Sequence, residues 1–225
     1  MDEIKVVLDA LEQNDLVLLD TNVFSEESQG EGLCEKLYEV RRPKNLTPLA
    51  EDISKLKTLW QQYYDNIIRH PKIRTTPSVL KEMKDFAGII QDCYQWHSGF
   101  YGPELKNGEG NRRLSNRERV LKRMAEERGI TRNDVPQALE DLGTLSTLMQ
   151  KTIRDIKIYN EKTVPISRRY NGASDADYSL VEAAMGYMES HPEEKVEIIS
   201  FDKHIPQIIR GYLFSQVIEL TKDIN

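Results

Sequence analysis

The sequence predicts an α/β fold with a mainly parallel central sheet, in which helices heavily outnumber strands. Short apolar segments of strand length alternate along the chain with longer segments whose apolar residues recur at helical spacing. The segment 15–20 (DLVLLD) is wholly apolar between two acids, which is typical of a strand buried on both faces of a sheet. The 225 residues, 39% of them hydrophobic, suit one large domain with a sizeable core.

In the first half of the chain, the apolar spacing predicts several helices separated by short strands. Helices are expected over 2–13, 31–41, 49–69 and about 76–97, and strands over 15–20 and 72–75. A polar loop is expected at 25–30. Thr76 is a good N-cap and Pro77 suits the first helical position, so together they mark the start of the fourth helix.

In the second half, residues 98–113 hold four glycines and a proline and are predicted to form a loop or hinge. With helices expected over 115–128 and 134–163, this loop opens a charged helical insertion at about 98–170. Ser174, with Asp177 three residues on, forms a variant capping box that starts a helix. The remaining elements are expected as a helix to 190, a strand at 195–200, a short helix from 203 and a last strand at 216–220.

The charge distribution limits the classes of partner. The formal net charge of −6 argues against non-specific wrapping of nucleic acid. Residues 106–132 nevertheless carry nine bases against four acids, a local charge of +5, so the rest of the chain carries −11. This asymmetry indicates an acidic centre beside a basic arm.

The sequence gives no sign of a membrane or secreted protein. No apolar run approaches the roughly 18 residues of a membrane span, and the first residues lack the pattern of a signal peptide. Cys34 and Cys93 form neither a CxxC motif nor a disulfide framework, so we expect a cytoplasmic protein with no membrane partner. Glycine-rich nucleotide-binding loops are absent from the sequence.

Acidic residues stand where the predicted strands end. Asp20 closes the first strand, Asp202 follows the 195–200 strand, and Glu82 lies early in the helix after the second strand. Asp175 and Asp177 lie in the first turn of a helix, where an acid is ordinarily a cap or complements the helix dipole. Capping explains Asp20 and Glu82 poorly. Because parallel strands end at one edge of a sheet, we expect four carboxylates to converge there: Asp20, Glu82, Asp202 and either Asp175 or Asp177.

Converging carboxylates repel one another, so some must take up protons or share a bound cation. Oxygen ligands without histidine or cysteine at matching spacing predict Mg²⁺ or Mn²⁺ rather than Zn²⁺. The four histidines share no such spacing and are expected to be surface or packing residues: His70, His97, His191 and His204. A hard-cation site of this kind suits phosphoryl chemistry.

Four segments carry a resemblance to the PIN-domain nuclease family. They are Leu18–Asn22 (LLDTN), Thr76–Glu82 (TPSVLKE), Ser174–Asp177 (SDAD) and Ile198–Lys203 (IISFDK). Each segment alone is a weak signal, but all four stand in the family's order and in the expected structural context. The resemblance covers roughly residues 15–90 and 170–220.

The resemblance implies a single PIN-like domain over 1–225 with a Rossmann-like α/β/α sandwich. It also implies a metal-dependent endoribonuclease that hydrolyses RNA phosphodiester bonds with one or two Mg²⁺ or Mn²⁺ ions. The implied catalytic and metal-binding residues are Asp20, Glu82, Asp177 and Asp202, with Asp175 as an extra or substitute metal ligand. Asn22 and Ser200 would orient these ligands without binding the metal themselves.

The basic segment of the predicted insertion leaves two interpretations open. Arg112, Arg113 and Arg117 adjoin the glycine-rich hinge and are candidate RNA-binding residues, although mixed charges on a helix usually form a solvated face. The insertion is also a candidate surface for a protein partner or a homo-oligomer. The alternative function is a non-catalytic PIN-like module that binds RNA or protein, but an intact acidic set favours catalysis.

Overall fold

A three-stranded parallel sheet lies at the centre of the molecule, with strand order β2-β1-β3. The computed structural model describes residues 3–24, 49–106 and 134–222. The strands are β1 (Leu16–Leu19), β2 (Ile73–Arg74) and β3 (Val196–Ile199). The predicted α/β class and the parallel sheet are therefore confirmed.

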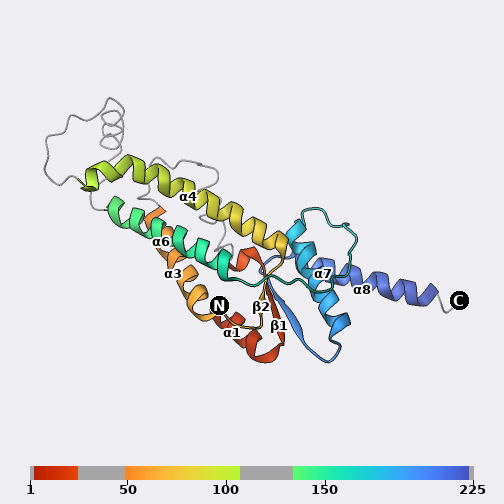
Figure 1. Cartoon of the computed structure of the whole chain (residues 1–225). Coiled ribbons are helices and arrows are strands. Elements are labelled where there is room, and N and C mark those ends of the chain that lie inside the picture. The colour runs from red at the N-terminus through yellow and green to blue at the C-terminus, as the bar shows by residue number, and fades with distance from the viewer. Residues whose placement is uncertain (1–2, 25–48, 107–133, 223–225) are drawn as a thin grey trace.

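Helices surround this small sheet on several sides (Figure 1). They are α1 (Glu3–Gln13), the 3-10 helix η1 (Thr21–Phe24), α3 (Ala50–Asn66), α4 (Pro77–Lys106), α6 (Asp134–Asp155), α7 (Asp175–Ser190) and α8 (His204–Lys222). Helices α3, α4 and α6 pack together and extend to the left of the sheet in Figure 1, and we call them the helical arm. Helix α7 packs on β3, α4 and α8.

Strand β1 is the central strand because it is apolar throughout. All four of its residues are buried, and it pairs with β2 through Val17 and Ile73 and with β3 through Leu18 and Ile198. The backbone NH of Asp20 continues the pairing by donating to the Ile199 carbonyl at 3.1 Å. All three strands run in the same direction, so the residues that follow them share one edge of the sheet.

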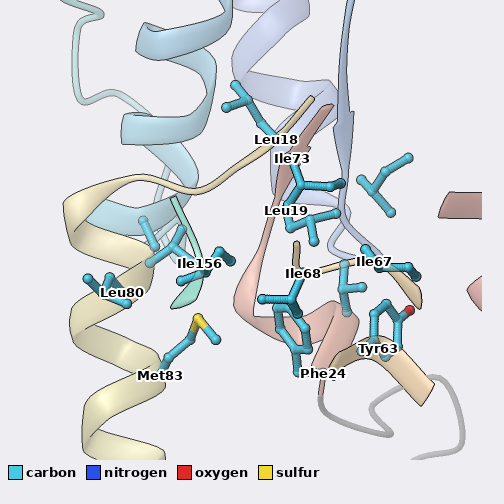
Figure 2. Packing of buried hydrophobic residues seen from close by; sticks show 14 of the residues in the cluster. Leu18, Leu19, Phe24, Tyr63, Ile67, Ile68, Ile73, Leu80, Met83 and Ile156 are labelled. Atoms are coloured by element: carbon cyan, nitrogen blue, oxygen red, sulfur yellow. The ribbon is translucent and has the colours of Figure 1, made fainter. Parts of the chain in front are cut away.

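A buried cluster fixes the chain immediately after β1. The centroid of the Phe24 ring lies 5.0 Å from that of Trp60 and 5.1 Å from that of Tyr63. The Trp60 indole NH also donates to the Phe24 carbonyl at 3.0 Å. Figure 2 shows Phe24 beside Ile68 and Tyr63 in this cluster. Full burial of each such side chain is worth about 1.5–3 kcal/mol, so η1 is held firmly against the helical arm.

Two predicted boundaries in the middle of the chain are wrong. Residues 98–106, predicted as part of a hinge, continue helix α4 to Lys106. Helix α6, predicted to reach 163, ends at Asp155, because the following backbone pairs beside β2: Thr75 NH donates to the Lys157 carbonyl, and Tyr159 NH donates to the Thr75 carbonyl.

The end of the chain also differs from the prediction. Residues 216–220, predicted as a strand, belong to α8, and the helix predicted as short from 203 runs to Lys222. Ile205 and Ile208 of α8 are buried at helical spacing, so the early part of this segment already carries a helical pattern. The predictions for 25–30, 31–41 and 115–128 fall outside the described residues. Among the helices that the structure describes, none is long and apolar enough to cross a membrane.

Candidate metal centre

A pocket of about 230 Å³ opens at the edge where β1 and β3 end. It is lined by Asp20, Thr21, Asn22, Glu82, Gly172, Ser174, Asp177 and Asp202. Half of these residues are carboxylates, and none is a lysine or an arginine. The structure therefore brings together the four acids that the sequence predicts to converge.

Asp20 is the most deeply placed acid of the pocket, with only 3% of its surface exposed. Its Oδ1 accepts from the Thr21 backbone NH at 2.6 Å, and its Oδ2 accepts from the Ser200 hydroxyl at 2.7 Å. Burial raises the pKa of Asp20 to about 6, and the charges of Asp177 and Glu82 raise it further, although both hydrogen bonds oppose this shift. Holding Asp20 ionised therefore costs free energy in the absence of a cation.

Ser200 connects two of the acids through its hydroxyl group. It donates to Asp20 and accepts both from the Asn22 side-chain amide at 3.1 Å and from the Asp202 backbone NH at 3.0 Å. A hydroxyl has one donor and two acceptor positions, so this one is fully used. The Asn22 carbonyl oxygen in turn accepts from the Phe201 NH at 3.1 Å. Asn22 and Ser200 thus lie behind the carboxylates, where they fix their orientation.

Asp177 both caps a helix and lines the pocket. Its backbone NH donates to the Ser174 hydroxyl at 3.2 Å, and its Oδ2 accepts from the Ser174 NH at 2.6 Å, which confirms the predicted capping box. Burial raises the pKa of Asp177, and the charge of Asp202 adds to the effect. Asp175, by contrast, is exposed and is not among the lining residues. Of these two acids, only Asp177 faces the pocket.

Glu82 reaches the pocket from the second turn of α4. Its Oε2 accepts from the Thr21 hydroxyl at 2.9 Å. Because the Thr21 backbone NH also donates to Asp20, one residue contacts two of the acids. Thr21 was not singled out in the sequence, although it directly follows the acid at the strand end.

His204 lies beside the acids, contrary to the expectation that it is a surface or packing residue. Its Nδ1 is 3.0 Å from Asp202 Oδ1 and 4.0 Å from Asp177 Oδ2. One ligand atom from each of these three residues lies within 4.8 Å of the others. A local feature of the sequence could have indicated this position. His204 stands two residues after Asp202 at the start of α8, so both side chains lie at the same end of that helix.

Gly172 shapes the same corner of the pocket. Its φ of +92° is rarely adopted by residues with a side chain. A Cβ at this position would lie 3.3 Å from His204 Nε2. Glycine therefore allows the loop before α7 to pass close to the imidazole ring.

The donor chemistry of the pocket fits a divalent cation. Its four carboxylates supply the oxygen ligands that Mg²⁺ and Mn²⁺ accept, and a cation would offset the burial and repulsion that raise the pKa of Asp20. The predicted RNA-binding residues Arg112, Arg113 and Arg117 lie outside the described residues. Comparisons with protein-family models, curated proteins and solved structures find no match.

Proposed function

We propose that the protein is a metal-dependent endoribonuclease that hydrolyses RNA phosphodiester bonds at the carboxyl edge of its sheet. The observation that supports this proposal is the convergence of Asp20, Glu82, Asp177 and Asp202 in one pocket. They come from four separate segments of the chain, and each segment carries one of the PIN-like motifs. RNA as the substrate class is taken from the resemblance of those motifs.

Mg²⁺ or Mn²⁺ would be held by the same four carboxylates. Such an ion lowers the pKa of bound water and neutralises the charge that develops on a phosphate during hydrolysis. The lining contains no lysine or arginine that could take over this electrostatic role.

The protein's own contribution is to hold the carboxylates in place before substrate arrives. Ser200 and the Thr21 NH fix both oxygens of Asp20, and the Thr21 hydroxyl fixes Glu82. The capping box fixes Asp177 at the start of α7. Ligands supported in this way need little rearrangement during the reaction, which is the main protein contribution to metal-assisted catalysis.

The direct test is cleavage of single-stranded and structured RNA by the purified protein with Mg²⁺, with Mn²⁺ and with EDTA. Asp20→Asn should reduce the rate by at least about 10³-fold, since several kcal/mol of transition-state stabilisation depend on the charge at this position. Asp85→Asn is the matched control, because Asp85 is an exposed acid on α4, one turn after Glu82. It should cleave RNA at the parent rate.

Each alternative has its own result. Cleavage by Asp20→Asn at the parent rate would contradict the proposed mechanism. Binding of Mn²⁺, seen as a raised melting temperature, without cleavage of any RNA would favour the non-catalytic PIN-like module. A melting temperature that millimolar Mn²⁺ leaves unchanged would contradict the metal site itself.

A further inference from the structure

We infer that His204 supplies a nitrogen ligand beside Asp177 and Asp202, so that the pocket binds a first-row transition-metal ion such as Mn²⁺ in preference to Mg²⁺. This inference rests on the metal site of the proposed function and specifies which cation that site selects. It does not depend on the identity of the RNA, or on whether RNA is cleaved.

The distances place the three side chains around one position. His204 Nδ1 and Asp202 Oδ1 are 3.0 Å apart. Two neighbouring ligands of an octahedral ion, each about 2.1 Å from it, lie about 3 Å apart. Asp177 Oδ2 is 4.0 Å from the same nitrogen, and all three ligand atoms fall within 4.8 Å of one another. The separations of 3.0 and 4.0 Å from the nitrogen lie within the range expected between two ligands of one octahedral ion.

The Nδ1 atom of His204 has no hydrogen-bond partner in the described part of the chain. His204 Nδ1 is buried and makes no hydrogen bond with the described residues, since its short contact with Asp202 lacks hydrogen-bond geometry. A buried polar atom left in this state destabilises the folded protein. A metal ion would satisfy the nitrogen lone pair and both carboxylates at once.

The mixed donor set determines which cations are favoured. Mg²⁺ prefers oxygen ligands in a nearly ideal octahedron, whereas transition-metal ions also accept imidazole nitrogen. A site built only from Asp20, Glu82, Asp177 and Asp202 would be an oxygen site. Adding His204 shifts the preference towards transition metals. The competing interpretation is that His204 only forms an ion pair with Asp202, in which case no nitrogen would contact the metal.

Pulsed electron paramagnetic resonance of the full-length protein loaded with Mn²⁺ separates these interpretations, because it detects a ¹⁴N nucleus bound directly to the ion. The parent protein should show this ¹⁴N coupling, and His204→Gln should lack it. His70→Gln is the matched control, because His70 follows α3 and does not belong to the group of potential ligands that Asp177, Asp202 and His204 form. It should keep the coupling of the parent.

Metal titrations measure the selectivity itself. In His204→Gln, Mn²⁺ affinity should fall at least about tenfold, a typical loss when a ligand contact is removed, whereas Mg²⁺ affinity should change less. Circular dichroism establishes that the variant is folded. The measurement on the parent protein needs no variant, so a folding defect in His204→Gln would leave the ¹⁴N test intact.

The outcomes distinguish this inference from the proposed function. Mn²⁺ binding with no ¹⁴N coupling would overturn the nitrogen ligand and leave a carboxylate metal centre and its nuclease activity standing. Absence of any Mn²⁺ binding would overturn both. A ¹⁴N coupling in a protein that cleaves no RNA would support the nitrogen ligand and contradict only the nuclease proposal.

Discussion

The helical arm and the carboxyl edge of the sheet both bury aspartates, but they treat them in opposite ways. In the arm, Asp141 is 5% exposed and accepts from the Lys57 ammonium at 2.7 Å and from the Gln137 amide at 3.1 Å. At the sheet edge, Asp20 is 3% exposed and accepts from a hydroxyl and a backbone NH. The arm supplies a lysine ammonium, whereas the pocket has no lysine or arginine among its described lining residues.

The same contrast holds for the protonation of neighbouring acids. The Tyr64 hydroxyl and the Arg154 guanidinium lower the pKa of Asp155, which ends α6. Burial raises the pKa of Asp20 and Asp177 at the sheet edge. A buried acid with its own cation stays ionised, whereas buried acids that face one another either take up protons or share a cation. A buried acid that is paired with a cation therefore stabilises the fold, whereas neighbouring buried acids without such a partner mark a candidate site.

The largest expected effect is on pH-dependent stability without metal. The pKa of Asp20 rises on folding from 3.8 to about 6, so between these values the folded state binds more protons than the unfolded state. Stability should therefore fall as pH rises from about 4 to about 6, by up to about 3 kcal/mol, and then level off. Urea unfolding in EDTA at several pH values measures this slope.

Asp20→Asn provides the comparison for that measurement. The variant should lose most of the slope, and the remainder should come from Asp177, whose pKa is shifted in the same direction. Asp85→Asn should keep the full slope. A parent protein whose stability is flat across this range would contradict the view that the sheet edge stores uncompensated charge.

The second prediction breaks the pairing in the helical arm. Lys57→Met should lower the free energy of unfolding by about 2 kcal/mol, because it leaves the buried Asp141 carboxylate without its cation. Lys55→Met, two residues away on α3, is the matched control, since Lys55 pairs with the exposed Glu51 and such pairs contribute about 0–1 kcal/mol. Equal effects of the two substitutions would remove the distinction between the regions.

The smallest expected effect compares a glycine from each region. Gly172→Ala should destabilise the protein by about 1–2 kcal/mol, because it forces a side chain into a positive φ and towards His204. Gly88→Ala, on an exposed position of α4 with no atom within 4 Å of the new Cβ, should stabilise by about 0.5–1 kcal/mol. Thermal melting checks both signs. Stabilisation by Gly172→Ala would show that this corner of the pocket tolerates a side chain.

Much of the central fold could be predicted from local patterns. The apolar LVLL segment gave β1, and the Ser174–Asp177 pair gave the start of α7. Convergence of the acids followed from one geometric fact, namely that parallel strands end at one edge. These features depend on short segments or on general properties of sheets, so a single sequence contains them.

What could not be predicted depends on tertiary contacts. The glycines within 98–106 favour a hinge, but this segment continues helix α4 to Lys106. The segment 216–220 (QVIEL) has the length of a strand, and only its continuity with α8 identifies it as helix. His204 was expected to be a surface or packing residue because its spacing matches no linear metal motif. Its contact with Asp202 is local, whereas its approach to Asp177 depends on how α7 and α8 meet.

The bond between Ser200 and Asp20 joins residues 180 positions apart, and this has a consequence for protein synthesis. Until β3 has been translated, β1 lacks one of its two neighbours, and Asp20 lacks both Ser200 and the nearby Asp202. A nascent chain therefore cannot assemble the pocket before residue 202 has been synthesised.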